Sequence, residues 1–359
     1  MVLALALCLS GECQEVEFSL VRLPQAPGEK IRGAALASSQ PFRLYTWGNR
    51  LLSWEVPHGK VTVLREGEIE YGEGGCLCDV NGDRAPDLVV LERAPRAGEL
   101  GRMVWLEAPH WSRHVIDSGA EFRDCLAATL HGRRGVLVIH RYLQIRFYEV
   151  PPDPTQRWPY REIYSLYTPS NQGGLLVADI DGDGLADIVA GNYWIRSPKR
   201  FELSWRLFAI NLWTETPESA MNRLAFASLS GSGFPELIAA QSDMPEARLA
   251  WFSRPDDATQ LWPQHRLEGA LRLRHPRALA AGDLDGDGLA DIAAGELNGR
   301  DSRLIVFRNR GGGRFTPVTI GETSGLLQLW LADLDGDGAT DILGVGPESA
   351  AWWRSHLRK

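Results

Sequence analysis

Short apolar runs alternate with turn-forming residues along most of the chain. Runs such as 88–91, 188–190, 237–240 and 304–307 are rich in Leu, Ile, Val and aromatic residues, and Gly, Pro, Asp or Asn separate them. The spacing of an amphipathic helix does not persist over any long segment. Short runs of this kind between turn signals predict an all-β protein.

The apolar runs belong to a repeat of about 50 residues. Four nine-residue segments, beginning at Asp79, Asp179, Asp283 and Asp333, align without gaps, and each ends in an aspartate that an apolar run follows. The segment from 228 to 236 keeps this shape but carries serines, and a weaker copy starts at 129. Three strand-like pieces between 31 and 56 add one more unit and predict seven units in all.

Each unit contains four strand-like segments, and the third usually carries an aromatic residue. Trp54, Trp105, Trp194 and Trp251 recur at the period of the repeat, so we expect them to pack between units. Four short strands per unit, repeated radially, are typical of a β-propeller. The sequence therefore predicts a seven-bladed β-propeller with four-stranded blades.

The two ends of the chain predict how the ring closes. The last unit reaches only a third strand at 350–353, and the segment 16–23 near the N-terminus matches a fourth strand without a unit of its own. Pairing these two segments would complete the last blade and remove two open sheet edges. We expect residues 15–359 to form a single propeller closed in this way.

The first residues and the cysteines bear on the cellular compartment. Residues 1–13 are predicted to be a signal peptide, because their apolar run has the length of a signal-peptide core and is too short to cross a membrane. We therefore expect a secreted, periplasmic or cell-surface protein without a transmembrane segment. The five cysteines do not suggest a disulfide framework, and Cys76 and Cys78 are interpreted as small buried apolar residues.

The composition excludes some function classes. The chain has 44% hydrophobic and 23% charged residues and a formal net charge of -8, values that are ordinary for a globular protein. It has no long basic tract, so we expect no nucleic-acid partner. We also expect a monomer.

The four acidic segments predict metal sites. Carboxylates at alternate positions would repel one another, and a hard cation such as Ca²⁺ takes six to eight oxygen ligands at roughly 2.3–2.6 Å. Positions 1, 3, 5 and 9 supply side-chain oxygens, and position 7 supplies a backbone carbonyl. The candidate ligands are Asp79, Asn81, Asp83, Ala85, Asp87, Asp179, Asp181, Asp183, Leu185, Asp187, Asp283, Asp285, Asp287, Leu289, Asp291, Asp333, Asp335, Asp337, Ala339 and Asp341.

We expect about four structural calcium ions, one for each acidic segment. The segment with Asn81 and Arg84 should hold its ion most weakly. The serine segment at 228–236 and the segment at 129–133 should hold none. An acidic turn without metal is the less favoured reading. An EF-hand is excluded, because that loop places a glutamate at position 12.

The motif Asp-x-Asp-Gly-Asp-Gly-x-x-Asp followed by a β run resembles the FG-GAP/VCBS-type repeat. The resemblance is to the repeat of integrin α propellers and of many bacterial exported proteins, and it extends over essentially the whole chain after residue 13. It implies an exported seven-bladed propeller. It does not imply one function, since propellers carry many unrelated functions.

No catalytic motif stands out, so a non-enzymatic binding module for a glycan or protein ligand is the favoured function. The residues that precede the first strand of each unit should surround the propeller axis, and Trp213 is the best single candidate for an exposed stacking residue. The candidate ligand-binding residues are Arg123, Gln172, Trp213, Asn222, Arg223, His275, Arg277 and Gln328. A carbohydrate-active lyase or hydrolase with a loop-built site, and a structural module of a surface assembly, remain as alternatives.

Overall fold

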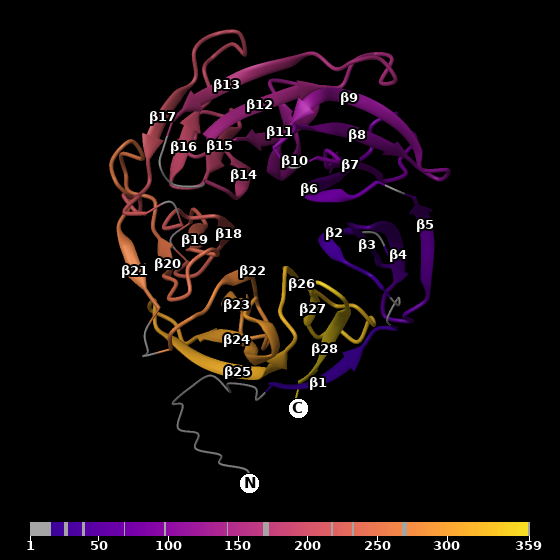
Figure 1. The fold of residues 1–359 in the computed structure, drawn as a ribbon. Coiled ribbons are helices and arrows are strands. Elements are labelled where there is room, and N and C mark those ends of the chain that lie inside the picture. Colours follow the sequence, from indigo (N-terminus) through magenta and orange to yellow (C-terminus); the bar gives the residue numbers. More distant parts are fainter. Residues whose placement is uncertain are drawn as a thin grey trace.

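Seven four-stranded antiparallel sheets form a ring around a central axis (Figure 1). The computed structural model describes residues 16–24, 28–37, 40–67, 69–96, 98–141, 143–167, 172–216, 218–231, 233–267 and 271–357. This architecture confirms the predicted seven-bladed β-propeller. The predicted signal peptide, residues 1–13, lies outside the described residues.

Consecutive strands build six of the blades, from the axis outward. Blade 1 contains β2 (Ile31–Ala37), β3 (Arg43–Gly48), β4 (Arg50–Glu55) and β5 (Val61–Glu66). Blade 2 contains β6 (Tyr71–Cys78), β7 (Asp87–Glu92), β8 (Gly101–Glu107) and β9 (Ser112–Ala120). Blade 3 contains β10 (Phe122–Leu130), β11 (Arg133–His140), β12 (Leu143–Glu149) and β13 (Tyr160–Leu166).

The second half of the ring repeats this order. Blade 4 contains β14 (Leu175–Ala178), β15 (Asp187–Ala190), β16 (Tyr193–Arg196) and β17 (Arg206–Ala209). Blade 5 contains β18 (Arg223–Ala227), β19 (Glu236–Ala240), β20 (Leu249–Phe252) and β21 (Gln264–Arg266). Blade 6 contains β22 (Pro276–Gly282), β23 (Asp291–Glu296), the short 3₁₀ helix η1 (Gly299–Asp301), β24 (Ser302–Asn309) and β25 (Phe315–Thr323).

Blade 7 joins the two ends of the chain. It contains β26 (Gln328–Ala332), β27 (Asp341–Val345), β28 (Ala350–Leu357) and, as its outer strand, β1 (Val16–Arg22). β1 is antiparallel to β28, with Leu20 opposite Trp353 and Arg22 opposite Ala351. The predicted closure of the ring by an N-terminal strand is therefore confirmed (Figure 1).

The recurring tryptophans bury their rings between blades, as the repeat period predicted. Trp54, Trp105, Trp194 and Trp251 are at most 4% exposed. Trp105 of blade 2 shares a core cluster with Val136 of blade 3, and the other three tryptophans likewise join clusters that include a neighbouring blade. Burying such large apolar surfaces fixes each blade against the next. Within the described residues, no helix has the length and apolarity of a membrane span.

Candidate functional site

The four acidic segments occupy equivalent places in their blades. Each connects the inner strand to the second strand, in blades 2, 4, 6 and 7. Because the inner strands all run in the same direction along the axis, these loops lie on one face of the ring. We call them acidic loops, and they comprise residues 79–87, 179–187, 283–291 and 333–341.

The first aspartate of each acidic loop holds the turn together. In blade 4, Asp179 Oδ1 accepts a hydrogen bond from the Gly182 amide at 2.8 Å, and Oδ2 accepts one from the Gly184 amide at 2.9 Å. Both glycines have positive φ, 76° and 85°, which glycine adopts at little cost. In blade 2 Arg84 takes the second of these places with φ 71°, so this loop carries a non-glycine residue in an unfavourable conformation.

The ninth aspartate ties each loop to the third strand of its blade. Asp187 is fully buried, and its two oxygens accept hydrogen bonds from the amides of Ile180 (3.1 Å) and Ser197 (2.6 Å). Asp87, Asp291 and Asp341 make the equivalent pair of bonds. Burial, with help from the charges of Asp181 and Asp183, raises the pKa of Asp187 to about 7.

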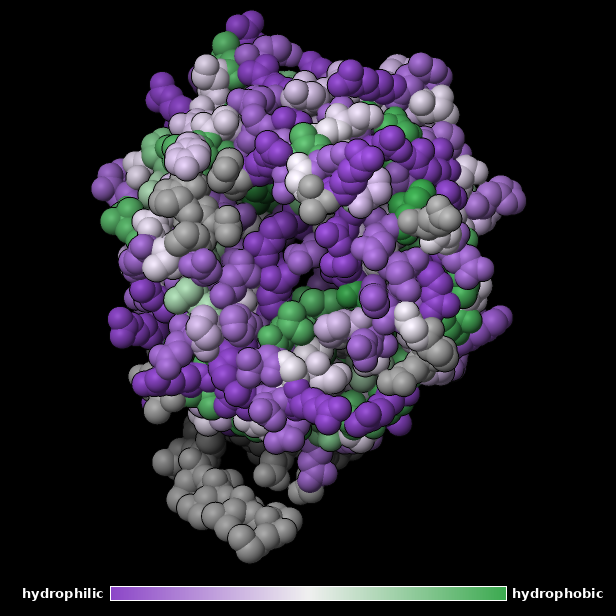
Figure 2. Space-filling view, in the orientation of Figure 1, coloured by the Kyte–Doolittle hydropathy of each residue, from purple (hydrophilic) through white to green (hydrophobic). Residues whose placement is uncertain are grey.

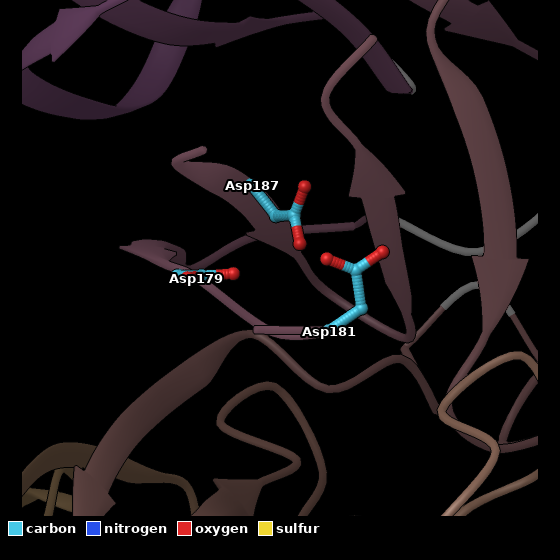
Figure 3. A group of neighbouring side chains, drawn as sticks. All are labelled: Asp179, Asp181 and Asp187. Carbon is cyan, nitrogen blue, oxygen red and sulfur yellow. The ribbon is translucent and has the colours of Figure 1, made fainter. Parts of the chain in front are cut away.

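Three of the acidic loops bring carboxylates close together, with too little positive charge nearby to balance them. In three loops, one carboxylate oxygen from each of three aspartates lies within 4.8 Å of the others. The groups are Asp179, Asp181 and Asp187 (Figure 3), Asp283, Asp285 and Asp287, and Asp333, Asp335 and Asp341. Both oxygens of Asp181 and of Asp285 are buried and accept no hydrogen bond. Buried carboxylate oxygens without donors fit a hard cation such as Ca²⁺.

Arginines on the third strands also approach the acidic loops. Arg196 Nε lies 2.5 Å from Asp181 Oδ2, out of line for a hydrogen bond, and Arg354 Nε lies 2.7 Å from Asp335 Oδ2. Each guanidinium supplies one positive charge to a loop that holds four aspartates. The arginines therefore neutralise the loops only in part.

The acidic loop of blade 2 satisfies its own polar groups. Asn81 replaces the aspartate at position 3, and its Nδ2 donates to Asp83 Oδ2 (3.1 Å) and to Glu107 Oε1 (3.2 Å). Glu107 occupies the place on β8 that Arg196 occupies on β16, because each follows the residue paired with the start of the second strand. An amide and a glutamate thus stand where blade 4 has a carboxylate and an arginine.

Blades 3 and 5 close the same connection differently. In blade 5, Glu236 accepts a hydrogen bond from the Leu229 amide at 2.8 Å and another from the Ser230 hydroxyl. In blade 3, β10 and β11 meet in a two-residue turn at His131 and Gly132, both with positive φ. Neither connection gathers carboxylates in its described residues.

A network of charged side chains crosses the ring near the opposite ends of the inner strands. Arg277 of blade 6 contacts Glu73 of blade 2 (2.9 Å) and Asp243, which follows β19 of blade 5 (2.8 Å). Arg123 of blade 3 contacts Asp243 at 3.0 Å. Together with Asp124 and Arg223, which lie 3.9 Å apart, these residues form the axial cluster. Polar surface surrounds the hollow at the centre of the ring in Figure 2, with an apolar strip on one side.

The arginines of the axial cluster keep Asp243 and Glu73 ionised. Burial alone would raise the pKa of Asp243, but hydrogen bonding and charge from Arg123, with the charge of Arg277, outweigh burial and lower the pKa to about 2. The pKa of Glu73 is also lowered, because the charges of Arg277 and Arg123 outweigh its burial. Three arginines face three acids, so the cluster carries no net charge.

Most of the predicted ligand-binding residues have structural partners. Asn222 donates to Asp243 Oδ2 (3.1 Å), and Gln172, only 3% exposed, accepts from the Asn192 amide. Gln328 accepts a hydrogen bond from the Ala34 amide across the seam between blades 7 and 1. His275 has φ 45° and donates its amide to Met244 O. The structure brings Arg123, Asn222, Arg223 and Arg277 together.

The prediction that Trp213 is exposed is wrong. Its side chain is 5% exposed, stands edge-on to Phe252 with ring centroids 5.5 Å apart, and donates from Nε1 to Gln264 at 3.2 Å. Arg248 covers the ring at 5.3 Å. The polar residues around Trp213 in the sequence pointed to exposure, but the ring turns inward to fill the core between blades 4 and 5.

Asp243, which joins two arginines of the axial cluster, was missing from the sequence prediction. It follows the second strand of blade 5, whereas the candidate residues were taken only from the approach to the first strand. The available signal was its position: the end of a second strand lies beside the start of the antiparallel first strand, so an acidic residue just after a second strand is also a candidate.

Comparisons with known proteins agree with this architecture. Residues 283–344 match the model of the FG-GAP-like repeat. No curated protein sequence matches the chain. The WD40 β-propeller domain of Doa1 is similar in structure, with 9% identity, a TM-score of 0.56, and coverage of 95% of this chain and 97% of that chain. An ancestral GH74 enzyme is also similar, with 13% identity, a TM-score of 0.60, and coverage of 92% of this chain but only 48% of the enzyme.

At these identities the structural likeness shows the fold alone. The matched repeat spans the acidic loop of blade 6 and extends to that of blade 7. The chain is thus a seven-bladed β-propeller that carries an FG-GAP-like repeat.

Proposed function

We propose that this chain is an exported, calcium-stabilised propeller that binds a hydroxyl-rich ligand, such as a glycan, at the mouth formed by the axial cluster. The observation that carries the calcium part is that all four carboxylate oxygens of Asp181 and Asp285 are buried and accept no hydrogen bond, although the Arg196 guanidinium approaches Asp181. Bound calcium would supply the missing positive charge. Three ions are favoured, because blades 4, 6 and 7 each gather three aspartates, whereas Asn81 gives the blade 2 loop an internal substitute.

In each calcium loop the chain's own residues prepare the site. The first and ninth aspartates hold the backbone of the turn, so the carboxylate at position 3 is presented in a fixed place. Ligand positions that are fixed before binding reduce the entropy that binding must overcome. Bound ions would therefore stabilise the loop between the first two strands of blades 4, 6 and 7.

The pKa values at the axial cluster support binding rather than acid catalysis there. A general acid must hold its proton near neutral pH, which needs a raised pKa. The pKa values of Asp243 and Glu73 are lowered instead. A neutral array of guanidinium donors and carboxylate acceptors suits sugar hydroxyls, which both donate and accept hydrogen bonds.

Calcium dependence can be tested by thermal unfolding and metal titration. Protein stripped with a chelator should unfold at a clearly lower temperature than protein in calcium, because an ion that binds only the native state adds about 2.7 kcal/mol per site at 100 times its Kd. Calorimetric titration should give three tight ions. Magnesium at equal concentration is the control. Equal melting temperatures with and without calcium would refute this part of the proposal.

Ligand binding can be tested with an array of neutral and acidic glycans. Labelled protein in calcium should bind a subset of neutral glycans, and Asp243→Asn should lose that binding, because Arg123 and Arg277 would no longer be held in place. Arg96→Ala, at an exposed side chain, is the matched control. Binding that survives Asp243→Asn in a correctly folded variant would place the ligand elsewhere.

A further inference from the structure

Two cysteines meet where the inner strands of blades 2 and 3 lie side by side. Cys76 is in β6, Cys125 is in β10, and their Sγ atoms are 2.6 Å apart, although 49 residues separate them in the sequence. Both lie on strands that the propeller holds against each other. Because a disulfide needs two cysteines whose backbones are already placed for it, a rigid contact between strands is a suitable position.

The surroundings of the pair are apolar and tightly packed. Cys76 is 9% exposed and belongs to a core cluster with Trp105 and Val138, against which Cys78 and Cys125 also pack. The cluster spans blades 2 and 3, so a bond between the two sulfurs would add a covalent link to the packing and to hydrogen bonds such as that from Tyr148 Oη to Asp117 Oδ2 (2.9 Å).

We propose that Cys76 and Cys125 form a disulfide that joins blades 2 and 3 when the protein folds in an oxidising compartment. The oxidant is a disulfide of low molecular weight or of a dithiol oxidoreductase. One cysteine thiolate attacks it, forms a mixed disulfide and releases one thiol. The second cysteine then displaces the other thiol and forms the Cys76–Cys125 bond, so the two protein thiols together give up two electrons and two protons.

The third cysteine is expected to stay reduced. Cys78 packs against the same core cluster, but the close approach between sulfurs joins Cys76 and Cys125. Burial raises the pKa of Cys125 well above its ordinary value. Oxidation is therefore expected during folding, before the two blades enclose the thiols.

Peptide mapping after refolding tests the bond directly. The full chain is refolded in calcium with reduced and oxidised glutathione, then unfolded, alkylated without reductant and cut with trypsin. Cleavage after Arg65, Arg84, Arg123 and Arg133 gives peptide 66–84, with Cys76 and Cys78, and peptide 124–133, with Cys125. The expected product is a cross-linked pair of these peptides that carries one alkyl group on Cys78.

Variants assign the bond and measure its effect. Cys78→Ser should keep the cross-link, and Cys76→Ser and Cys125→Ser should lose it. Reductant should lower the melting temperature of the wild type and of Cys78→Ser by roughly 5 °C, as expected for one disulfide in a chain of this size, and leave Cys125→Ser unchanged. Recovery of Cys76 and Cys125 as separate alkylated or glutathione-capped residues in refolded wild type would overturn the proposal, and this readout does not require any variant to fold.

Discussion

Carboxylates gather at both ends of the inner strands, but they meet different partners there. In the acidic loops the carboxylate oxygens of Asp181 and Asp285 are buried and accept no hydrogen bond, and Arg196 offsets the charge of its loop only in part. In the axial cluster, by contrast, Asp243 and Glu73 contact Arg123 and Arg277. The same chemical group is therefore short of positive charge on one face of the ring and neutralised by the protein on the other.

The pKa values record this difference. Burial and neighbouring aspartates raise the pKa of Asp187 and of Asp291 to about 7. The arginines around Asp243 lower its pKa to about 2, although its burial acts in the opposite direction. Burial alone does not decide the outcome, because both regions desolvate their acids. The supply of cationic side chains decides it, and the calcium that we propose for the acidic loops would supply the charge that they lack.

The largest effect is expected when pH is varied without calcium. A carboxyl whose folded pKa lies above its unfolded value near 3.8 binds its proton more tightly in the native state, so chelated protein should gain stability as pH falls from about 7 to 4. The pKa of Asp243 is lowered in the folded protein, so its contribution to stability should be lost as pH falls from about 4 to 2. Thermal unfolding in chelator should therefore show a maximum on the acid side of neutrality.

Other groups also titrate in this range, so the calcium series is the control. Burial lowers the pKa of His140 to about 4, and this group alone would remove stability as pH falls from 6.5 to 4. It acts equally with and without calcium, so the difference between the two series isolates the acidic loops. The difference in melting temperature between the calcium and chelator series should shrink as pH falls from 7 to 5, because protons compete with the metal for the carboxylates. A constant difference would contradict the comparison.

A smaller effect is expected when blade 4 is converted to the pattern of blade 2. Asp181→Asn should remove one ion from the calorimetric titration and about 2.7 kcal/mol of calcium-dependent stability. The variant should also be no less stable than wild type in chelator, because it removes one of four aspartate charges that a single arginine, Arg196, offsets. The double variant Asp181→Asn, Arg196→Glu copies the Asn81 and Glu107 pair, and it should fold equally well with and without an ion in this loop.

The smallest effect is expected from the reverse exchange in blade 2. Asn81→Asp places a carboxylate beside Asp83 and Glu107 and removes the two hydrogen bonds that Asn81 donates. Stability in chelator should fall by about 1–2 kcal/mol, and calcium should restore part of it. Unfolding curves in both buffers measure this. An equal loss of stability in the chelator and calcium buffers would show that the blade 2 loop cannot accept an ion even with the full set of aspartates.

The sequence predicted the blades and their closure because both depend on patterns that repeat. The 50-residue period located the inner strands, and the unpaired segment at 16–23 matched the missing fourth strand of blade 7. The acidic loops were also predictable, since their spacing fixes which residues share a turn. The exchange of Arg196 for Glu107 could have been found by aligning the third strands.

The contacts across the ring could not be predicted in this way. Arg277 meets Glu73 at a separation of 204 residues, and Cys76 meets Cys125 between blades, so each depends on the geometry of the ring rather than on a local pattern. Trp213 was misplaced for a related reason: a polar neighbourhood in the sequence does not show which way a single side chain turns, and core volume between two blades decided its direction.

Closure by β1 also constrains the order of events during synthesis. β1 is synthesised before the other described strands and its partner β28 after them, with Ser19 and His356 337 residues apart. β1 therefore has no partner strand until β2 to β27 have been made, and the seventh blade cannot close the ring before β28 is available.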